Sequence, residues 1–498
     1  MEVYEIPHFV NGKHVTEEHM RGGVITHSAT GGVIGHVSFA SQALITEAVS
    51  GAQKAFITWS QTTPSQRVKV FFAFRNIVEQ HKNVLAHLLV KEHGKTLEDA
   101  LGSIARGLEV VEWYCGYLHA HTSDFSHHIA QGVDCYTIRE PLGVCLGITP
   151  FNFPVMVPLW MLMPAIAAGN TFILKPSEQD SSAALQLCTW LVEAGLPSGV
   201  VQCLQGDRET VDSLLHHSDI AAVTAVASTP VAEYIYQTAI QQGKRAQTFG
   251  GAKNHAVVMP DADMVQAAQA IVGAAYGAAG ERCMAISVVM LVGDATAQSF
   301  LEAFVPQVRA IRIDIGDAPE VDMGPLISNS HRSKVLAAIE KGCQEGAELL
   351  LDGRDFEHPQ YPEGFFLGPT LFDKVTESMT VYQEEIFGPV LCIMRVPDLE
   401  TALACLNRHP YGNGAAIFTQ HGATAQTFIR EASAGMIGVN VPIPVPIVSH
   451  PFGGWKRSSF GDTNMHAMES LHFYTKRKTV TMRWPKLAET ASFQMPSH

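Results

Sequence analysis

Residues 144–178 read VCLGITPFNFPVMVPLWMLMPAIAAGNTFILKPSE, and this stretch gives the main signal for the fold class. Two short apolar runs, at 144–148 and 171–174, flank a longer apolar run at 159–168. Short runs of this kind are typical of strands buried on both faces, whereas the longer run is typical of a helix. The order predicts a strand–helix–strand unit with parallel strands.

The alternation continues beyond this unit. We expect a helix at 182–194, a strand near 200–204, a helix through Leu214, a strand near 221–226 and a helix from Pro230. Gly195 and Pro197 end the first of these helices, as a C-terminal glycine and a following proline do. The pattern predicts a doubly wound α/β fold built on a parallel sheet.

Ligands of doubly wound sheets bind at the carboxyl ends of the strands. Lys175-Pro-Ser-Glu178 follows one predicted strand end, and Ser228-Thr-Pro follows another. Neither place carries the G-x-G-x-x-G fingerprint of dinucleotide binding. These residues by themselves therefore leave nucleotide binding open.

The rest of the chain contains three further kinds of segment. Apolar stripes at helical spacing predict a helical first third, with Arg106 in its third helical stretch at 103–112. A second α/β region is expected from about Gly250 to Pro451. Residues 122–139 and 471–484 resemble strands without helical partners. Because exposed strand edges pair with other chains, we expect these two segments to form an assembly arm.

Composition excludes several classes of protein. The 498 residues are 46% hydrophobic and 16% charged, as in ordinary globular proteins, and the formal net charge is −14. Such an acidic chain is not expected to bind nucleic acid or anionic membranes. The apolar run at 155–168 is too short for a membrane span and contains Pro158 and Pro164. The acidic start, at residues 1–6, does not favour export.

The nine cysteines are dispersed, without a C-x-x-C pair. We therefore expect neither a disulfide framework nor a metal site. A reducing compartment, the cytoplasm, is the expected location.

One cysteine has unusual neighbours. Residues 277–287 read GAAGERCMAIS, so that small residues surround Cys283 and Arg282 directly precedes it. A cysteine is nucleophilic as its thiolate, and a neighbouring cation lowers its pKa. Small neighbours leave the sulfur accessible to a substrate. Although free cysteines are mostly inert packing residues, this setting predicts a nucleophile.

Five motifs occur in a fixed order around this cysteine. They are Pro150-Phe-Asn152-Phe-Pro154, Leu174-Lys175-Pro-Ser-Glu178, Tyr276-x-x-x-Gly280-Glu281-x-Cys283, Glu385-Ile-Phe387-Gly-Pro and Pro451-Phe-Gly-Gly. Together they resemble the aldehyde dehydrogenase superfamily over nearly the whole chain. Gly251-Ala-Lys-Asn-His255, Asn440-Val-Pro-Ile-Pro-Val-Pro446 and residues 457–464 are similar to one branch, the methylmalonate-semialdehyde dehydrogenases.

The resemblance implies NAD-dependent oxidation of malonate or methylmalonate semialdehyde. Coenzyme A would accept the acyl group, giving acetyl-CoA or propionyl-CoA and carbon dioxide. A homotetramer is implied, with an NAD-binding domain at 1–121 and 140–249, a catalytic domain at 250–452, and an oligomerisation arm at 122–139 and 468–486.

The resemblance also implies a role for each site residue. Cys283 would be the nucleophile, with Asn152 in the oxyanion hole, and Arg106 and Arg282 would bind the substrate's carboxylate. The expected cofactor-binding residues are Phe151, Lys175, Glu178, Ser228, Glu385 and Phe387.

Two departures from the family pattern bear on function. The chain has Ala225-Val-Ala227-Ser228 where the family commonly has Phe-x-Gly-Ser, and the alanine adds a methyl group beside the cofactor's phosphate. Hydrolytic members carry a glutamate at the position of Phe249. Since phenylalanine cannot accept a proton, we expect slow hydrolysis of the thioester and transfer to coenzyme A.

Other classes of function remain open at this stage. A thioesterase or amidase would use a cysteine without a redox cofactor, but it needs a histidine, and none lies near Cys283 in sequence. A scaffold protein would have an unreactive Cys283. A hydrolytic NAD(P)-dependent enzyme acting on another small aldehyde is the nearest alternative.

Overall fold

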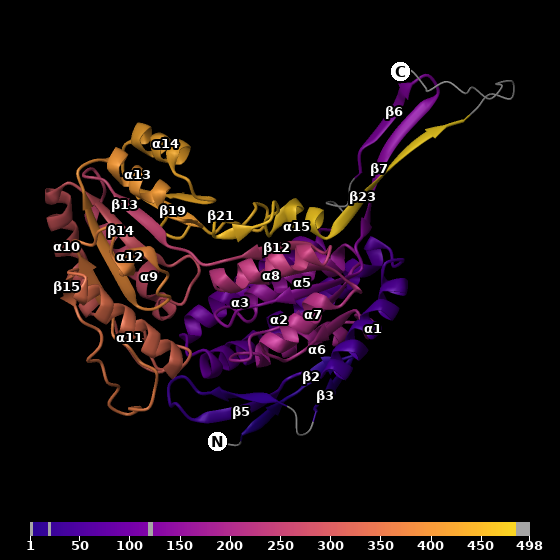
Figure 1. Cartoon of the computed structure of the whole chain (residues 1–498), viewed down its shortest axis with the longest axis horizontal. Helices are drawn as coiled ribbons and strands as arrows, with labels where there is room; N and C mark the ends of the chain where they lie inside the picture. Colours follow the sequence, from indigo (N-terminus) through magenta and orange to yellow (C-terminus); the bar gives the residue numbers. More distant parts are fainter. Residues whose placement is uncertain (1–2, 18–20, 118–122, 485–498) are drawn as a thin grey trace.

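The computed structural model describes residues 3–17, 21–117 and 123–484. Two α/β units lie next to each other, and a narrow sheet projects from one of them (Figure 1). Parts of the expected segments lie outside the described residues: 1–2, 18–20 and 118–121 of the first domain, and 122 and 485–486 of the arm.

Eight described strands form the sheet of the first unit, in the order β22-β12-β11-β8-β9-β10-β2-β3. The strands from β8 to β12 run parallel, and β22, β2 and β3 add antiparallel edges. Their bounds are β2 (His8–Val10), β3 (Lys13–Val15), β8 (Val144–Ile148), β9 (Thr171–Lys175), β10 (Val201–Cys203), β11 (Ile220–Val226), β12 (Arg245–Phe249) and β22 (Ser459–Phe460). The doubly wound parallel sheet is thus confirmed.

Helices cover this sheet, and two of them, α2 and α3, pack mainly on other helices: α1 (Gln42–Trp59), α2 (Pro64–Glu92), α3 (Leu97–Cys115), α5 (Met156–Ala167), α6 (Ser182–Glu193), α7 (Arg208–His216) and α8 (Thr229–Gln241). Every residue of α5 is buried, which its apolar composition on all faces explains. The first third is not purely helical. It also contains a small sheet of β1 (Tyr4–Ile6), β5 (Val33–Ser38) and β4 (Gly22–Thr26).

Gly107 sets the close approach of α3 to α5. A Cβ atom at this position would lie 2.9 Å from Leu159 Cδ1 and 3.4 Å from Met156 Cα. Because the two helix backbones approach so closely here, the neighbouring residue Arg106 is held beside α5.

Seven described strands form the sheet of the second unit, in the order β15-β16-β17-β14-β13-β19-β20. All neighbours are parallel except β15 and β16. The strands are β13 (Asn254–Val258), β14 (Ile286–Val292), β15 (Glu348–Leu351), β16 (Thr370–Asp373), β17 (Val390–Val396), β19 (Gly414–Phe418) and β20 (Met436–Val439). The helices are α9 (Met264–Tyr276), α10 (Asp294–Arg309), α11 (Asn329–Gln344), α12 (Thr380–Gln383), α13 (Leu399–Arg408) and α14 (Gly422–Glu431).

A third sheet projects from the first unit, in the order β23-β7-β6 (Figure 1). It consists of β6 (Phe125–Ala130), β7 (Val133–Pro141) and β23 (Thr475–Arg483). The strand expected at 471–484 begins only at Thr475, because the preceding residues form α15 (Ala467–Phe473). Leu471 and Phe473 on this helix are buried in the core of the first unit.

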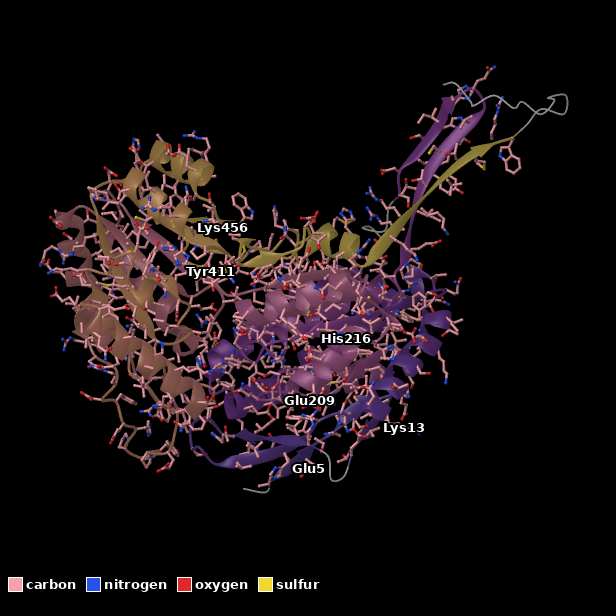
Figure 2. All side chains as sticks on the ribbon, in the orientation of Figure 1. Glu5, Lys13, Glu209, His216, Tyr411 and Lys456 are labelled. Atoms are coloured by element: carbon pink, nitrogen blue, oxygen red, sulfur yellow. The ribbon has the colours of Figure 1, made fainter. Side chains whose placement is uncertain are left out.

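The C-terminal segment ties the two units together. Strand β21 (Trp455–Lys456) pairs with β18 (Tyr411–Gly412) of the second unit, and Tyr411 and Lys456 lie close together in Figure 2. The ammonium of Lys456 donates to the carbonyl groups of Leu406, Asn407 and His409 at the end of α13. Four residues on, β22 pairs with β12 of the first sheet.

Two negative findings hold for the described ranges. No helix among these residues is long and apolar enough to cross a membrane. No group of three or more His, Cys, Asp or Glu side chains there is arranged to hold a metal ion.

Candidate active site

Cys283 lies on a tightly bent loop between α9 and β14. Three successive residues of this loop, Ala278, Ala279 and Gly280, have φ angles of 49°, 51° and 74°. Left-handed backbone costs about 1 kcal/mol or more at each alanine, so the surrounding structure must hold the loop. A Cβ atom on Gly280 would collide with the carbonyl group of Gly388. The loop is thereby pressed against the segment that carries Glu385 and Phe387.

Three asparagine side chains hold the peptide groups of this loop. Asn254 Nδ2 and Asn413 Nδ2 both donate to the Cys283 carbonyl, at 3.0 and 3.1 Å. Asn152 Nδ2 donates to the Glu281 carbonyl at 3.0 Å. The three asparagines come from the loop after β8, from β13 and from the turn before β19, so segments far apart in sequence fix one short loop.

The main chain of Asn152 is itself fixed by a hydrogen bond from a buried lysine. The buried ammonium of Lys95 donates to the Asn152 carbonyl at 2.7 Å and lies 3.5 Å from the Asp99 carboxylate. An amide nitrogen carries two hydrogens. One Asn152 hydrogen binds the Glu281 carbonyl, and the other remains available to an oxygen near Cys283.

Sequence reasoning missed Lys95, Asp99 and Asn413 as parts of this site. Asn254 lies inside a motif used for the family resemblance, but its role was not assigned. A buried charged residue can be noticed only once burial is known, and the sequence offers no pattern that marks Lys95 as buried.

The pKa of the Cys283 thiol is about 12, well above its usual value. Burial raises it most, and the nearby Glu385 carboxylate raises it further. The backbone N–H groups of Cys283 and Met284 and the charge of Arg282 lower it, with less effect. The thiol is therefore protonated at neutral pH in the ligand-free site, and Arg282 does little to activate it.

Glu385 lies in the same pocket as Cys283 and Lys253. Its Oε1 accepts a hydrogen bond from the Ala252 N–H at 2.8 Å, and burial raises its pKa to about 7. Lys253 donates to the Glu384 carbonyl at 2.7 Å, and its charge partly opposes the rise in the pKa of Glu385. This carboxyl group is poised to exchange a proton near neutral pH.

Arg282 points into a cleft of about 930 Å³ between α3, α9 and residues 441–443. Its guanidinium forms an ion pair with Asp99 and donates to the Gly273 carbonyl at 3.3 Å. A Cβ atom on Gly277 would collide with this guanidinium. The cleft thus contains a positioned cation, and Cys283 lies in a smaller pocket that Arg282 also lines.

Arg106 lies further along α3 and has different partners. Its Nη1 pairs with Glu109 at 2.6 Å, and its Nη2 donates to the Pro446 carbonyl at 2.7 Å. The two predicted carboxylate-binding arginines therefore each have a carboxylate partner of their own in the described structure.

The predicted cofactor residues gather at one edge of the first sheet. Lys175 is the last residue of β9 and Glu178 follows it, Ser228 follows β11, and Phe151 follows β8, which lies between those two strands. Lys175 Nζ lies 3.1 Å from Glu178 Oε2. Ser228 is the N-cap residue of α8, where helix N–H groups favour an anion such as a phosphate.

Residues from the second unit complete this edge. The rings of Phe151 and Phe387 meet edge to face with their centroids 5.9 Å apart. The Glu385 carboxyl lies so close to Gly251 that a side chain there would collide with it. A dinucleotide fits this donor set, since the edge offers a cation, carboxylates for ribose hydroxyls and a helix N-terminus for its phosphates.

The chain is similar to known proteins along nearly its whole length. The model of the aldehyde dehydrogenase family matches residues 15–480. A malonate-semialdehyde dehydrogenase from Pseudomonas aeruginosa is 47% identical over 98% of this chain and 99% of its own length. A mitochondrial acylating methylmalonate-semialdehyde dehydrogenase from Arabidopsis thaliana is 42% identical over 99% of this chain and 81% of its own.

A solved structure is similar along the whole chain. It is the NAD complex of a Sinorhizobium meliloti 1021 protein provisionally assigned as a methylmalonate-semialdehyde dehydrogenase, which superposes with a TM-score of 0.96. Its sequence is 49% identical, and the match covers 98% of this chain and 99% of that one.

The raised pKa of Cys283 gives a direct prediction for the ligand-free protein. Because only the thiolate reacts with iodoacetamide, alkylation of Cys283 should rise about tenfold per pH unit from pH 7 to 9 without levelling off. Peptide mass spectrometry measures the rate, and the peptide of the half-buried Cys135 is the internal control. A plateau near pH 8 would show that the thiol has an ordinary pKa.

Proposed function

Because this chain belongs to the aldehyde dehydrogenase family, we propose that it oxidises malonate or methylmalonate semialdehyde. NAD is the oxidant and coenzyme A accepts the acyl group, so that the products are acetyl-CoA or propionyl-CoA and carbon dioxide. The names of the relatives support this substrate class. The observation that carries the proposal is the guanidinium of Arg282, which lines both the open cleft and the small pocket that contains Cys283.

Arg282 and Arg106 are the proposed partners of the substrate's carboxylate. A guanidinium binds a carboxylate through two parallel hydrogen bonds, which fixes the orientation of a small substrate. In the ligand-free protein Asp99 and Glu109 occupy the two guanidinium groups. The incoming carboxylate therefore competes with acidic side chains that already hold the arginines in place.

The proposed cofactor site lies in the first unit, residues 1–121 and 140–249, and extends to the second. Lys175 and Glu178 bind the adenosine ribose, Ser228 the pyrophosphate and Glu385 the nicotinamide ribose, while Phe151 and Phe387 pack beside the nicotinamide. When bound, NAD supplies the acceptor for the hydride that leaves the substrate. A carboxylate on the adenosine ribose repels a 2′-phosphate, so that NAD is preferred over NADP.

Cys283 is the proposed nucleophile of the catalytic unit, residues 250–452. Its thiol loses its proton to solvent as the sulfur adds to the aldehyde carbon, and the carbonyl oxygen takes up the electron pair of the C=O bond and becomes negative. The free amide hydrogen of Asn152 and the backbone N–H of Cys283 receive this charge, and one such donor contributes about 3–4 kcal/mol. After oxidation the acyl group remains on Cys283 as a thioester.

The thioester then loses carbon dioxide before it leaves the enzyme. The bond to the carboxylate carbon breaks, and its electron pair moves into an enolate whose oxygen the same donors stabilise. A proton from solvent completes the acetyl or propionyl group. The coenzyme A thiolate attacks this thioester and releases Cys283. Phe249, buried at the end of β12, offers no base for water at the position used by hydrolytic relatives.

Assembly is proposed to use the projecting sheet. Its edge strands are unpaired within the described chain, and Phe125, Ile129 and Trp484 are 60%, 64% and 78% exposed. Exposed apolar strand edges pair with other chains. We infer a homotetramer in which residues 122–139 and 468–486 form the arm.

The assembly is tested by light scattering. The assembly should have four times the 54.0 kDa mass of one chain. Replacing both Phe125 and Ile129 with serine should shift the protein toward smaller species. Serine replacement of Val265, which is 66% exposed on α9, is the matched control. A monomeric wild-type chain would refute the tetramer.

The role of coenzyme A is tested by omitting it. With malonate semialdehyde and NAD alone, we expect a burst of about one NADH per active site followed by little turnover, because the thioester lacks an acceptor. Added coenzyme A should restore turnover and yield acetyl-CoA. Sustained release of free acid without coenzyme A, at the rate seen with it, would identify a hydrolytic enzyme instead.

The support of Asn152 by Lys95 gives a third prediction. Lys95→Met keeps the length of the side chain and removes the donor to the Asn152 carbonyl, so kcat should fall about tenfold or more as the oxyanion donor shifts. The dissociation constant for NAD, measured by calorimetry, should stay unchanged. Lys82→Met, at an exposed lysine of α2, is the control, and an equal kcat for both variants would contradict the role.

A further inference from the structure

The side chain of Glu281 lies in a buried polar cluster that none of the proposed steps uses. Glu281 stands two residues before Cys283, and its side chain is fully buried, as is that of His93, which directly follows α2. Glu281 Oε2 lies 3.7 Å from His93 Nε2, and Glu281 Oε1 lies 3.6 Å from the Nε2 of His331 on α11. The carboxyl group thus lies between two imidazole rings, one from each α/β unit.

Several polar atoms of this cluster have no hydrogen-bond partner in the described structure. They are Glu281 Oε2, both ring nitrogens of His93 and Asp99 Oδ2. Most buried polar groups in proteins are paired, because an unpaired one destabilises the fold. A shift of about 0.5 Å would bring Glu281 Oε2 and His93 Nε2 within ordinary hydrogen-bond distance. The two groups are therefore placed to pair with each other.

The surroundings of Glu281 disfavour a negative charge on its side chain. Burial raises the pKa of the carboxyl group well above its usual value. The Ile327 N–H, which donates to Oε1 at 3.2 Å, and the charge of Lys95 oppose this rise only in part. The carboxyl group consequently keeps its proton at neutral pH and can donate a hydrogen bond.

His93 is the acceptor that lies in reach of this proton. Burial, and after it the positive charge of Lys95, lowers the pKa of the imidazole well below its usual value. The charges of Arg282 and His331 act in the same direction, and the Asp99 carboxylate opposes them. The ring is therefore neutral at pH 7 and has one nitrogen that accepts. An uncharged acid and an uncharged imidazole can pair without burying a charge.

The cluster connects the catalytic loop with the two rings beside the proposed nicotinamide site. The ring centroids of His93 and Phe151 are 5.9 Å apart. On the other side, His331 Nε2 donates to the Phe387 carbonyl at 2.7 Å. Phe387 has a φ angle of 58°, an unfavourable backbone conformation that this hydrogen bond helps to hold. A change at Glu281 can therefore reach both rings.

We propose that Glu281 is a positioning residue that keeps its proton and donates it in a hydrogen bond to His93 Nε2. This bond holds the loop of Cys283 against the end of α2, while the Ile327 N–H fixes the second carboxyl oxygen. Because Asn152 donates to the carbonyl of the same glutamate, the pair also sets how the proposed oxyanion donor meets the loop. The inference rests on the proposed function only for its effect on turnover.

Infrared spectroscopy tests the protonation of Glu281 directly. At pH 7 with NAD bound, the difference spectrum between the wild-type enzyme and Glu281→Gln should contain the C=O stretching band of a protonated carboxylic acid. Glu400→Gln, the same change at an exposed position of α13, is the matched control and should give no such band. A spectrum for Glu281→Gln without the acid band would overturn the inference.

The partner of the proton is tested in the same way. His93→Phe keeps an aromatic ring and removes the acceptor, so the acid band of Glu281 should remain and move to higher frequency as its O–H loses the hydrogen bond. An acid band at an unchanged frequency in His93→Phe would show that the proton is not shared with His93.

Turnover tests the positioning role. Glu281→Gln keeps a donor for His93 and an acceptor for the Ile327 N–H, so kcat should stay within about twofold of the wild-type value. Glu281→Leu removes both contacts, and kcat should fall about tenfold or more as the loop shifts. Glu400→Leu is the control. A loss in Glu281→Gln as large as in Glu281→Leu, or no loss in either, would contradict the role.

If Glu281→Leu does not fold, the kcat of His93→Phe decides instead, and a value equal to that of the wild type would contradict the role. A wild-type enzyme that makes no acetyl-CoA from malonate semialdehyde would refute the proposed function. The infrared spectra need no turnover, so they still decide whether Glu281 keeps its proton and shares it with His93.

Discussion

The hydrogen bonds from asparagine amides to the catalytic loop are the constraint on which the rest of this structure depends. Asn254 and Asn413 hold the Cys283 carbonyl, and Asn152 holds the Glu281 carbonyl. The loop contains two alanines in left-handed backbone, so it cannot keep its shape without such contacts. Because the asparagines belong to both α/β units, the position of Cys283, the proposed nucleophile, depends on how the two units dock.

The charged residues around the loop follow from the same arrangement. Arg282, Asp99 and Lys95 form a chain of ion pairs that ends at the Asn152 carbonyl. The proposed substrate-binding arginine is thus linked to the proposed oxyanion donor by direct contacts. A substrate carboxylate that draws Arg282 away from Asp99 would affect the arginine and the Asn152 amide together. Recognition of the carboxylate is in this way coupled to the geometry of the oxyanion hole.

The sheet of the first unit could be predicted well, because the signals for its strands and helices lie within each segment of the sequence. Strands at 144–148 and 171–175 are continuous apolar runs, and the helices between them have their own period and end signals. The strands before residue 39 were missed because they are only three to six residues long. The strand expected at 471–484 was predicted to begin too early, because residues 471–473 belong to a short helix. Leu471 and Phe473 are compatible with a strand or a helix until their burial is known.

The site was predictable only in part, for a different reason. Motifs identified Cys283 and Asn152 as candidates, whereas Lys95 and Asn413 matter through contacts between segments more than fifty residues apart. The charge of Arg282 was foreseeable from its place beside the cysteine. Its partner Asp99 was not, because the two residues lie far apart in the sequence and meet only in the fold.

The central claim is that Cys283 carries an acyl group that has already lost carbon dioxide when coenzyme A arrives. Intact-protein and peptide mass spectrometry after mixing with malonate semialdehyde and NAD, without coenzyme A, tests it most directly. We expect an acetyl group on Cys283 and its disappearance when coenzyme A is added. An unmodified Cys283, or a malonyl group that persists until coenzyme A is added, would contradict it.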